Sequence, residues 1–192
     1  EAAVVLGVVG LVIGGIWVAA SEVKTNQIVS EIVAGTNQYV QGVRSLTKDT
    51  SFSWVVSSEN SGQFRLDAGL VPASWAVTGT YYNVAPGGVL VGLGGRDAID
   101  RTLRSIGLFY TFDSKQRGLC RRLLVALSHD YANINMVYGY SGLTAIYPFG
   151  GAMFTNLTLS KPIAISNAGV STICNATASG ATGPVFTIGW KQ

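Results

Sequence analysis

The chain begins with its most apolar stretch. Glu1 is followed by nineteen residues, 2–20, that contain no charged side chain. As an α-helix this stretch is about 28 Å long, close to the ~30 Å hydrocarbon core of a bilayer. A secretory signal peptide has basic residues ahead of its apolar core, whereas here an acid comes first and the first basic residue is Lys24. The pattern predicts a helix that spans a membrane or lies inside a bundle of helices.

The next thirty or so residues keep a helical period but become polar on one side. The apolar positions at helical spacing are Ile28, Ile32, Tyr39, Val43 and Leu46, and no proline interrupts them. The two stretches therefore predict one helix of about 45 residues, on the order of 65 Å long, which Gly35 and Gly42 weaken locally. We expect a hydrophobic segment over residues 1–20, its amphipathic continuation over 21–50, and a globular head over 51–192.

The head is expected to consist mainly of short strands. Runs rich in β-branched and aromatic residues predict strands at 78–84, 89–93, 107–112, 143–146, 154–159 and 185–190. Residues 85–88 predict a hairpin connection, and residues 97–105 suit a short helix. A second helix is expected to follow a cap at Asp113 or Ser114 and to reach Leu127. The chain is thus expected to have an α+β fold, with the long helix packed on an antiparallel sheet.

Four glycines lie within the apolar stretch, Gly7, Gly10, Gly14 and Gly15. Each costs about 1 kcal/mol relative to alanine in a helix interior, which a solitary membrane anchor has no reason to accept. Small residues do allow helices to approach closely in an apolar medium. The glycines therefore favour a helix-bundle core over an ordinary single-pass anchor, which is the alternative. Gly14 and Gly15 are also the weakest point of the helix, and we expect the helix to extend or unwind there when the protein leaves a membrane to pack with other helices.

Two features together resemble the type IV pilins, and specifically the type IVb subclass. The first is Glu1 heading a long helix that is hydrophobic and then amphipathic. The second is a strand, 107–112, that leads directly into a helix carrying Cys120. The resemblance covers these two features alone, since residues 52–107 and 131–171 match no pattern of the family.

The resemblance implies roles for a few residues. In the family the glutamate pairs with the N-terminal amine of a neighbouring subunit, so Glu1 is the expected assembly residue. Family members carry a short basic leader and a few apolar residues ahead of this glutamate, so we expect this chain to be trimmed at its start. A prepilin peptidase and a pilus assembly machinery are implied partners, with subunits held in the bacterial inner membrane before assembly.

The chain has two cysteines, Cys120 and Cys174, both outside the apolar stretch. An isolated pair in an exported domain favours a disulfide, and the subclass has one that joins such a helix to a cysteine near the C-terminus. That bond would close a loop of about 55 residues and add ~4 kcal/mol by the chain-entropy model. Two unrelated buried thiols are the alternative.

The surface charge is low and uneven. Charged residues make up 12% of the chain and the formal net charge is +3, which suits a subunit largely covered by copies of itself. A basic patch is expected from residues clustered between 96 and 122, namely Arg101, Arg104, Arg117, Arg121 and Arg122. It could bind acidic partners such as DNA or anionic cell-surface polymers, or it could complement an acidic face of the next subunit, which is the favoured interpretation.

Catalysis is not expected. The single histidine, His129, lies between Ser128 and Asp130, and three consecutive residues do not form a catalytic relay, which brings distant segments together. One histidine and two cysteines also fall short of a usual zinc ligand set. Residues 92–95 are glycine-rich but lack the lysine of a phosphate-binding loop. We expect no cofactor and no metal.

These observations predict a major structural subunit that polymerises through its N-terminal helix into an extracellular filament. Filaments of this family serve adhesion, aggregation, DNA transfer or phage attachment, with DNA or a host or recipient cell surface as the partner. The alternatives are a minor pilin, a secretion-system pseudopilin, a membrane-anchored surface binding protein, and a DNA-binding surface module.

Overall fold

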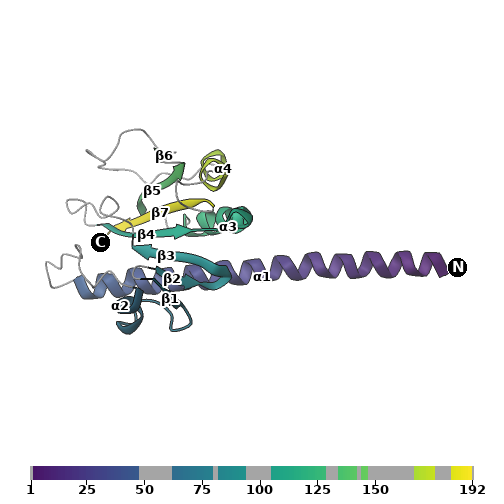
Figure 1. Cartoon of the computed structure of the whole chain (residues 1–192), viewed down its shortest axis with the longest axis horizontal. Helices are drawn as coiled ribbons and strands as arrows, with labels where there is room; N and C mark the ends of the chain where they lie inside the picture. The colour runs from purple at the N-terminus through teal and green to yellow at the C-terminus, as the bar shows by residue number, and fades with distance from the viewer. Residues whose placement is uncertain are drawn as a thin grey trace.

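The computed structural model describes residues 2–47, 62–79, 82–93, 105–128, 134–141, 144–146, 167–175 and 183–191. One long helix, α1 (Ala2–Thr47), runs from the N-terminus into a head of strands and shorter helices (Figure 1). Its 46 residues are continuous and extend about 69 Å. The predicted single helix is confirmed, and so is the α+β fold with this helix packed on an antiparallel sheet.

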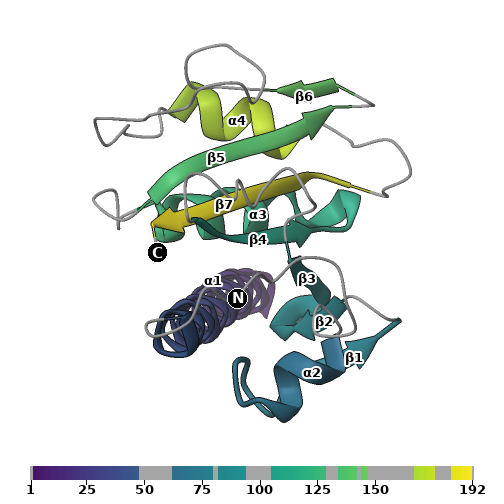
Figure 2. The ribbon, with the colours of Figure 1, turned by 90° about the vertical axis from the view of Figure 1, so that its left-hand side faces the viewer.

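The head contains one seven-stranded sheet, in the order β1-β2-β3-β4-β7-β5-β6, and every pairing in it is antiparallel. The strands are β1 (Ala76–Thr78), β2 (Tyr82–Ala85), β3 (Val89–Leu93), β4 (Ser105–Thr111), β5 (Ile134–Ser141), β6 (Thr144–Ile146) and β7 (Val185–Lys191). Although β7 is the last strand along the chain, it lies between β4 and β5. Figure 2 shows this arrangement, with β7 in yellow crossing the middle of the sheet.

The head also contains three further α-helices, α2 (Gly62–Asp67), α3 (Arg117–Leu127) and α4 (Asn167–Asn175). Short 3-10 turns, η2 (Pro86–Gly88) and η3 (Ser114–Gln116), precede β3 and α3 respectively. The helix α3 packs against both α1 and α4, while α4 also contacts β5 and β7.

The strand predictions were right in most places and wrong in one. The hairpin between β2 and β3 turns at η2 as expected, and the predicted strands at 107–112 and 185–190 correspond to β4 and β7. The single strand expected over 78–84 is wrong, because β1 ends at Thr78 and β2 begins at Tyr82, and the two run antiparallel. Gly79 allows the turn, since its φ of 58° lies in the left-handed region that side chains disfavour. The strand predicted over 154–159 lies outside the described residues, as does the short helix predicted over 97–105 except for Ser105, which is the first residue of β4.

One aromatic and aliphatic core joins α1 to the sheet. The hydroxyls of Thr36 on α1 and Tyr110 on β4 are hydrogen-bonded at 2.8 Å, and both residues are fully buried. Phe186 on β7 packs against Tyr110 and Phe112, with ring centroids 5.0 and 5.5 Å away respectively. The amphipathic half of α1 is therefore a structural part of the head.

Two glycines of α1 are positions of close helix contact. A Cβ atom at Gly35 would lie within 3 Å of the Trp75 ring, and one at Gly42 would lie 2.7 Å from the Leu70 side chain. Trp75 is only 1% exposed. Because Gly35 and Gly42 have no side chain, the segment after α2 packs directly against α1. The helix continues past both glycines to Thr47.

A buried polar group under β2 was not foreseen from the sequence. Arg65 of α2 is 1% exposed and its Nε donates to the Asn83 side-chain oxygen at 2.9 Å. Asn83 in turn donates to the Gly62 carbonyl at 3.1 Å. Burial lowers the pKa of Arg65, an effect that the nearby Tyr39 opposes. These contacts fix α2 against β2, since a buried polar group requires hydrogen-bond partners.

We expect Gly35→Ala to destabilise the head. The added methyl group would force Trp75 away, and overpacking of this kind costs about 1–3 kcal/mol, more than the ~1 kcal/mol gained in helix propensity. Gly118→Ala on α3 is the matched control, because a Cβ there meets nothing within 4 Å. Urea unfolding of the full chain in detergent, followed by circular dichroism, measures both. Equal changes in the two variants would contradict the close contact.

Alkaline pH is expected to unfold the head through two tyrosines. Burial raises the pKa of Tyr39 and of Tyr110 above the ordinary value of about 10. Above pH ~10 the unfolded chain loses these protons while the folded chain retains them, so stability falls as pH rises, by about 1.4 kcal/mol per pH unit for each tyrosine. The unfolding free energy of the double variant Tyr39→Phe/Tyr110→Phe should therefore decline less steeply above pH ~10 than that of the parent protein. Tyr82→Phe, at a half-buried position, should keep the steep decline.

Candidate functional site

The N-terminal half of α1 is uncovered. Every described side chain from residue 5 to 24 is exposed, including Leu11 at 79% and Trp17 at 73%. Figure 1 shows this part projecting from the head with no other element beside it. Exposed apolar patches of this extent mark contact with a membrane or with other protein. By length and composition α1 can cross a membrane, and its most apolar window has no part buried in the protein.

The glycines of this uncovered segment have no packing role within the chain. A Cβ at Gly7, Gly10, Gly14 or Gly15 would meet nothing within 4 Å. They differ in this from Gly35 and Gly42, where the head occupies the space that a side chain would need. The helix is continuous through Gly14 and Gly15 in this single chain, so the predicted extension there concerns the assembled form alone.

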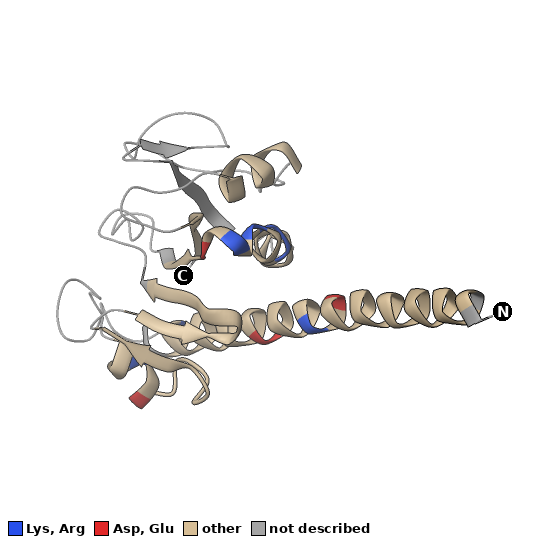
Figure 3. Cartoon of the chain, turned by 45° about the vertical axis from the view of Figure 1, so that its right-hand side comes forward, with Lys and Arg blue, Asp and Glu red and all other residues tan. Residues whose placement is uncertain are grey.

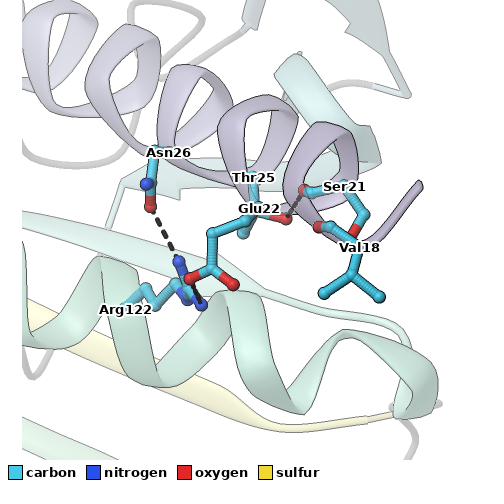
Figure 4. Close-up of polar contacts among 6 residues, drawn as sticks. All are labelled: Val18, Ser21, Glu22, Thr25, Asn26 and Arg122. Atoms are coloured by element: carbon cyan, nitrogen blue, oxygen red, sulfur yellow. Dashed lines mark hydrogen bonds and ion pairs between the residues drawn. The ribbon is translucent and has the colours of Figure 1, made fainter. Parts of the chain in front are cut away.

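A polar contact fastens α1 to the head at the point where the uncovered segment begins. Arg122 on α3 donates from Nη2 to the Glu22 carboxylate at 2.5 Å and from Nη1 to the Asn26 side-chain oxygen at 2.7 Å. Figure 4 shows the guanidinium reaching across to two successive turns of α1. Both charged side chains are about half exposed, at 41% and 55%, so solvent screens the pair. The contact is therefore expected to contribute little stability.

A second contact beside it involves the β2–β3 hairpin. The Gln116 side chain donates to the Gly87 carbonyl at 2.5 Å, and Ile28 and Leu119 lie against Gly87. The backbone of Gly87 has φ 76°, a conformation that glycine adopts without strain. Together with Arg122, this hairpin contacts α1 where it enters the head; residues Ile28, Gly87, Gln116, Leu119 and Arg122 are called the collar below.

The two cysteines form the expected disulfide, Cys120–Cys174. Both residues are fully buried, and the bond joins α3 to α4 across a sequence separation of 54 residues. Arg121 adds a hydrogen bond from its guanidinium to the Asn175 side-chain oxygen at 2.8 Å. The collar helix α3 is therefore covalently fixed to the C-terminal part of the head.

A capping box lies just before α3, at one of the two cap positions that the sequence predicted. The Asp113 carboxylate accepts from the Lys115 backbone N–H at 2.9 Å, and the Gln116 side chain accepts from the Asp113 N–H at 2.8 Å. This box caps the turn η3, and α3 follows directly after it without a side-chain cap of its own. Gln116 thus serves both this capping box and the collar contact with Gly87.

The structure separates the members of the predicted basic patch. Arg117 and Arg121 are exposed on α3, whereas Arg122 is engaged with α1. Figure 3 shows these basic segments of α3 in blue. Arg101 and Arg104, together with the assembly residue Glu1, lie outside the described residues, as does His129. Within the described segments no group of three or more histidine, cysteine or acidic side chains is placed to hold a metal ion.

Sequence reasoning missed the partner of Arg122. Glu22 lies 100 positions earlier in the chain, and no periodicity or motif connects residues so far apart. Arg65 was missed for a related reason, because arginine is ordinarily assigned to the surface.

Comparison with known proteins gives no identification. No family model, no curated protein and no solved structure matches this chain.

We expect Glu22 and Arg122 to be energetically coupled by about 0.2–1 kcal/mol, the range for exposed ion pairs. A double-mutant cycle of Glu22→Gln, Arg122→Gln and the double variant measures this coupling from urea unfolding of the full chain. The charge exchange Glu22→Arg/Arg122→Glu should recover part of the loss. A coupling of zero in the cycle, with no recovery on exchange, would show that the contact does not form in solution.

Proposed function

We propose that this protein is the structural subunit of a filament of the type IVb pilin kind, assembled outside the cell from subunits held in the bacterial inner membrane. The observation that carries the proposal is the uncovered half of α1. Nineteen uncharged residues follow Glu1, and they project as a helix whose glycines contact nothing within their own chain. Copies of the same helix supply the missing neighbours.

The energetics favour close packing as the source of assembly. Moving an apolar helix from lipid into a bundle gains little hydrophobic free energy, because lipid tails are already apolar. Small residues compensate by letting helix backbones approach, which increases dispersion contacts. Gly7, Gly10 and Gly14 recur at spacings of three and four residues, so they share one side of the helix. That side is where a neighbouring helix fits.

The head has features that suit an exported subunit. The Cys120–Cys174 disulfide persists in oxidising compartments and joins α3 to α4. The collar and the buried face of α1 fix the helix rigidly to this head. A membrane-anchored binding protein would share the disulfide, but it gives no reason for uncovered glycines in the spanning helix.

The direct test is electron microscopy of surface appendages sheared from cells that express the protein, with mass spectrometry of their main component. The proposal expects thin filaments composed chiefly of this chain. A minor pilin or pseudopilin would appear only in trace amounts in such filaments. Cells that express the intact protein and bear no filaments containing it would exclude the proposal.

We expect Gly10→Leu and Gly14→Leu to abolish filaments without unfolding the head. Neither position contacts anything within the chain, so the thermal unfolding of the detergent-solubilised subunit should not change. Filaments should disappear, because a leucine side chain keeps neighbouring helices apart. Val8→Leu, at an exposed and already large residue, is the matched control and should assemble.

Glu1→Ala tests the paired carboxylate in the same assay. An uncompensated charge at the edge of an apolar bundle is costly unless it is paired, so the variant should assemble poorly if Glu1 selects its neighbour. Normal yields of filaments from Glu1→Ala or from both leucine variants would show that this helix does not form the filament core.

A further inference from the structure

The basic residues of α3 lie at the membrane boundary defined by α1. Glu22 is the first charged residue after the uncharged stretch 2–20, so a bilayer that surrounds that stretch ends close to it. Trp17, exposed on the preceding turn, is of the residue type that concentrates at such interfaces. Because Arg122 bonds to Glu22 at 2.5 Å, α3 lies within one side-chain length of the lipid headgroups.

The helix α3 lies across α1, and this orientation keeps its whole length near that boundary. Figure 1 views α3 almost end-on beside α1, whereas Figure 2, which looks along α1, shows α3 lengthwise. Arg117 precedes Arg122 by five residues, about 8 Å along the helix axis. Figure 3 shows the basic segments of α3 at the end of the head from which the uncovered part of α1 projects.

One side of α3 is free for such a contact. Its buried residues, Cys120, Leu123, Leu124 and Leu127, face the core. Arg117, Arg121 and Val125 recur every fourth residue along a stripe beside this buried face, and all three are exposed. Arg117 forms no hydrogen bond or ion pair with any residue that the structure describes, and Arg121 has only the exposed bond to Asn175.

The charge balance at this boundary is positive. Two acidic side chains, Glu22 and Asp113, lie there among the described residues, against five basic ones: Lys24, Lys115, Arg117, Arg121 and Arg122. Basic residues near an anionic bilayer surface are attracted to it within a Debye length, about 8 Å at physiological salt.

We propose that the exposed face of α3, through Arg117 and Arg121, binds anionic phospholipid headgroups while α1 resides in the membrane. This contact rests on the membrane residence of α1 that the proposed function requires. It holds the head against the bilayer and restricts its rotation before assembly. It is broken when the subunit leaves the membrane, so α3 becomes free for other contacts only in the filament.

Photocrosslinking of the full chain in vesicles tests the proposal. A photoreactive amino acid at Gly118, where an added side chain meets nothing within 4 Å, reports which molecules lie against α3. The vesicles contain phosphatidylcholine alone or a mixture with phosphatidylglycerol, and flotation confirms insertion in both. We expect lipid adducts to increase roughly tenfold with the anionic lipid and to fall in ~1 M salt, where the Debye length is about 3 Å.

Two double variants provide the matched comparison. Arg117→Gln/Arg121→Gln should lose the roughly tenfold gain from anionic lipid, whereas Arg117→Lys/Arg121→Lys should keep it. Arg44→Gln removes one charge about 33 Å further along α1 and should behave as the parent. Circular dichroism verifies that each variant is folded.

Several outcomes would overturn the proposal. Equal adduct yields in the two lipids would show that headgroup charge is not recognised, as would unchanged yields in the glutamine variant. Crosslinks mainly to a second copy would assign the face to the next subunit. Loss of duplex-DNA retention in the glutamine variant, with lipid adducts unchanged, would assign it to nucleic acid.

The experiment also separates this proposal from the proposed function. A chain that floats with vesicles but shows no dependence on anionic lipid loses only the α3 contact. A chain that binds anionic lipid yet yields no filaments loses only the filament proposal. Failure to float with either vesicle would exclude both.

Discussion

The helix α1 is exposed along its first half and packed in the core of the head along its second half. The rest of the structure follows from that constraint. From residue 5 to 24 the side chains of α1 are exposed, and beyond Ile28 its apolar face is part of the head's core. The helix is unbroken between the two. The uncovered half and the half that packs in the core are therefore parts of one continuous element.

The head is built to receive this helix at two levels. Deep in the core, Gly35 and Gly42 leave room for Trp75 and Leu70, so contact there depends on shape. At the rim, Arg122 contacts α1 by hydrogen bonds and exposed charge, while the hairpin, bonded to Gln116 at Gly87, lies against Ile28 of α1. The contact is therefore apolar and close in the core and partly polar at the rim.

The sequence predicted the parts of this arrangement that depend on local pattern. The length of α1, the hairpin at Pro86–Gly88, the Asp113 cap and the α+β class each follow from spacing, turn residues or hydrophobic period. The short helices α2 and α4 were not predicted, since six and nine residues give too little periodicity. The split between β1 and β2 depended on one glycine conformation, which composition does not reveal.

In the candidate site, too, the features that follow from local sequence pattern were predicted and those that depend on tertiary contacts were not. Its apolar helix and glycines were evident from the sequence because they are contiguous. Its collar was not, because Glu22 and Arg122 lie 100 positions apart and are brought together by the tertiary fold alone. Buried Arg65 opposed the usual expectation for a charged residue, and the hydrogen bond to Asn83 that accommodates it joins two elements with no shared pattern.

The position of β7 imposes an order on biosynthesis. This strand pairs with β4 on one side and β5 on the other, so β5 and β6 cannot join the rest of the sheet until β7 has been synthesised. The apolar segment of α1, by contrast, is synthesised before any part of the sheet, and a helix satisfies its own backbone hydrogen bonds without the rest of the chain. The helix can thus form early, whereas the sheet is completed only when the last strand of the chain arrives.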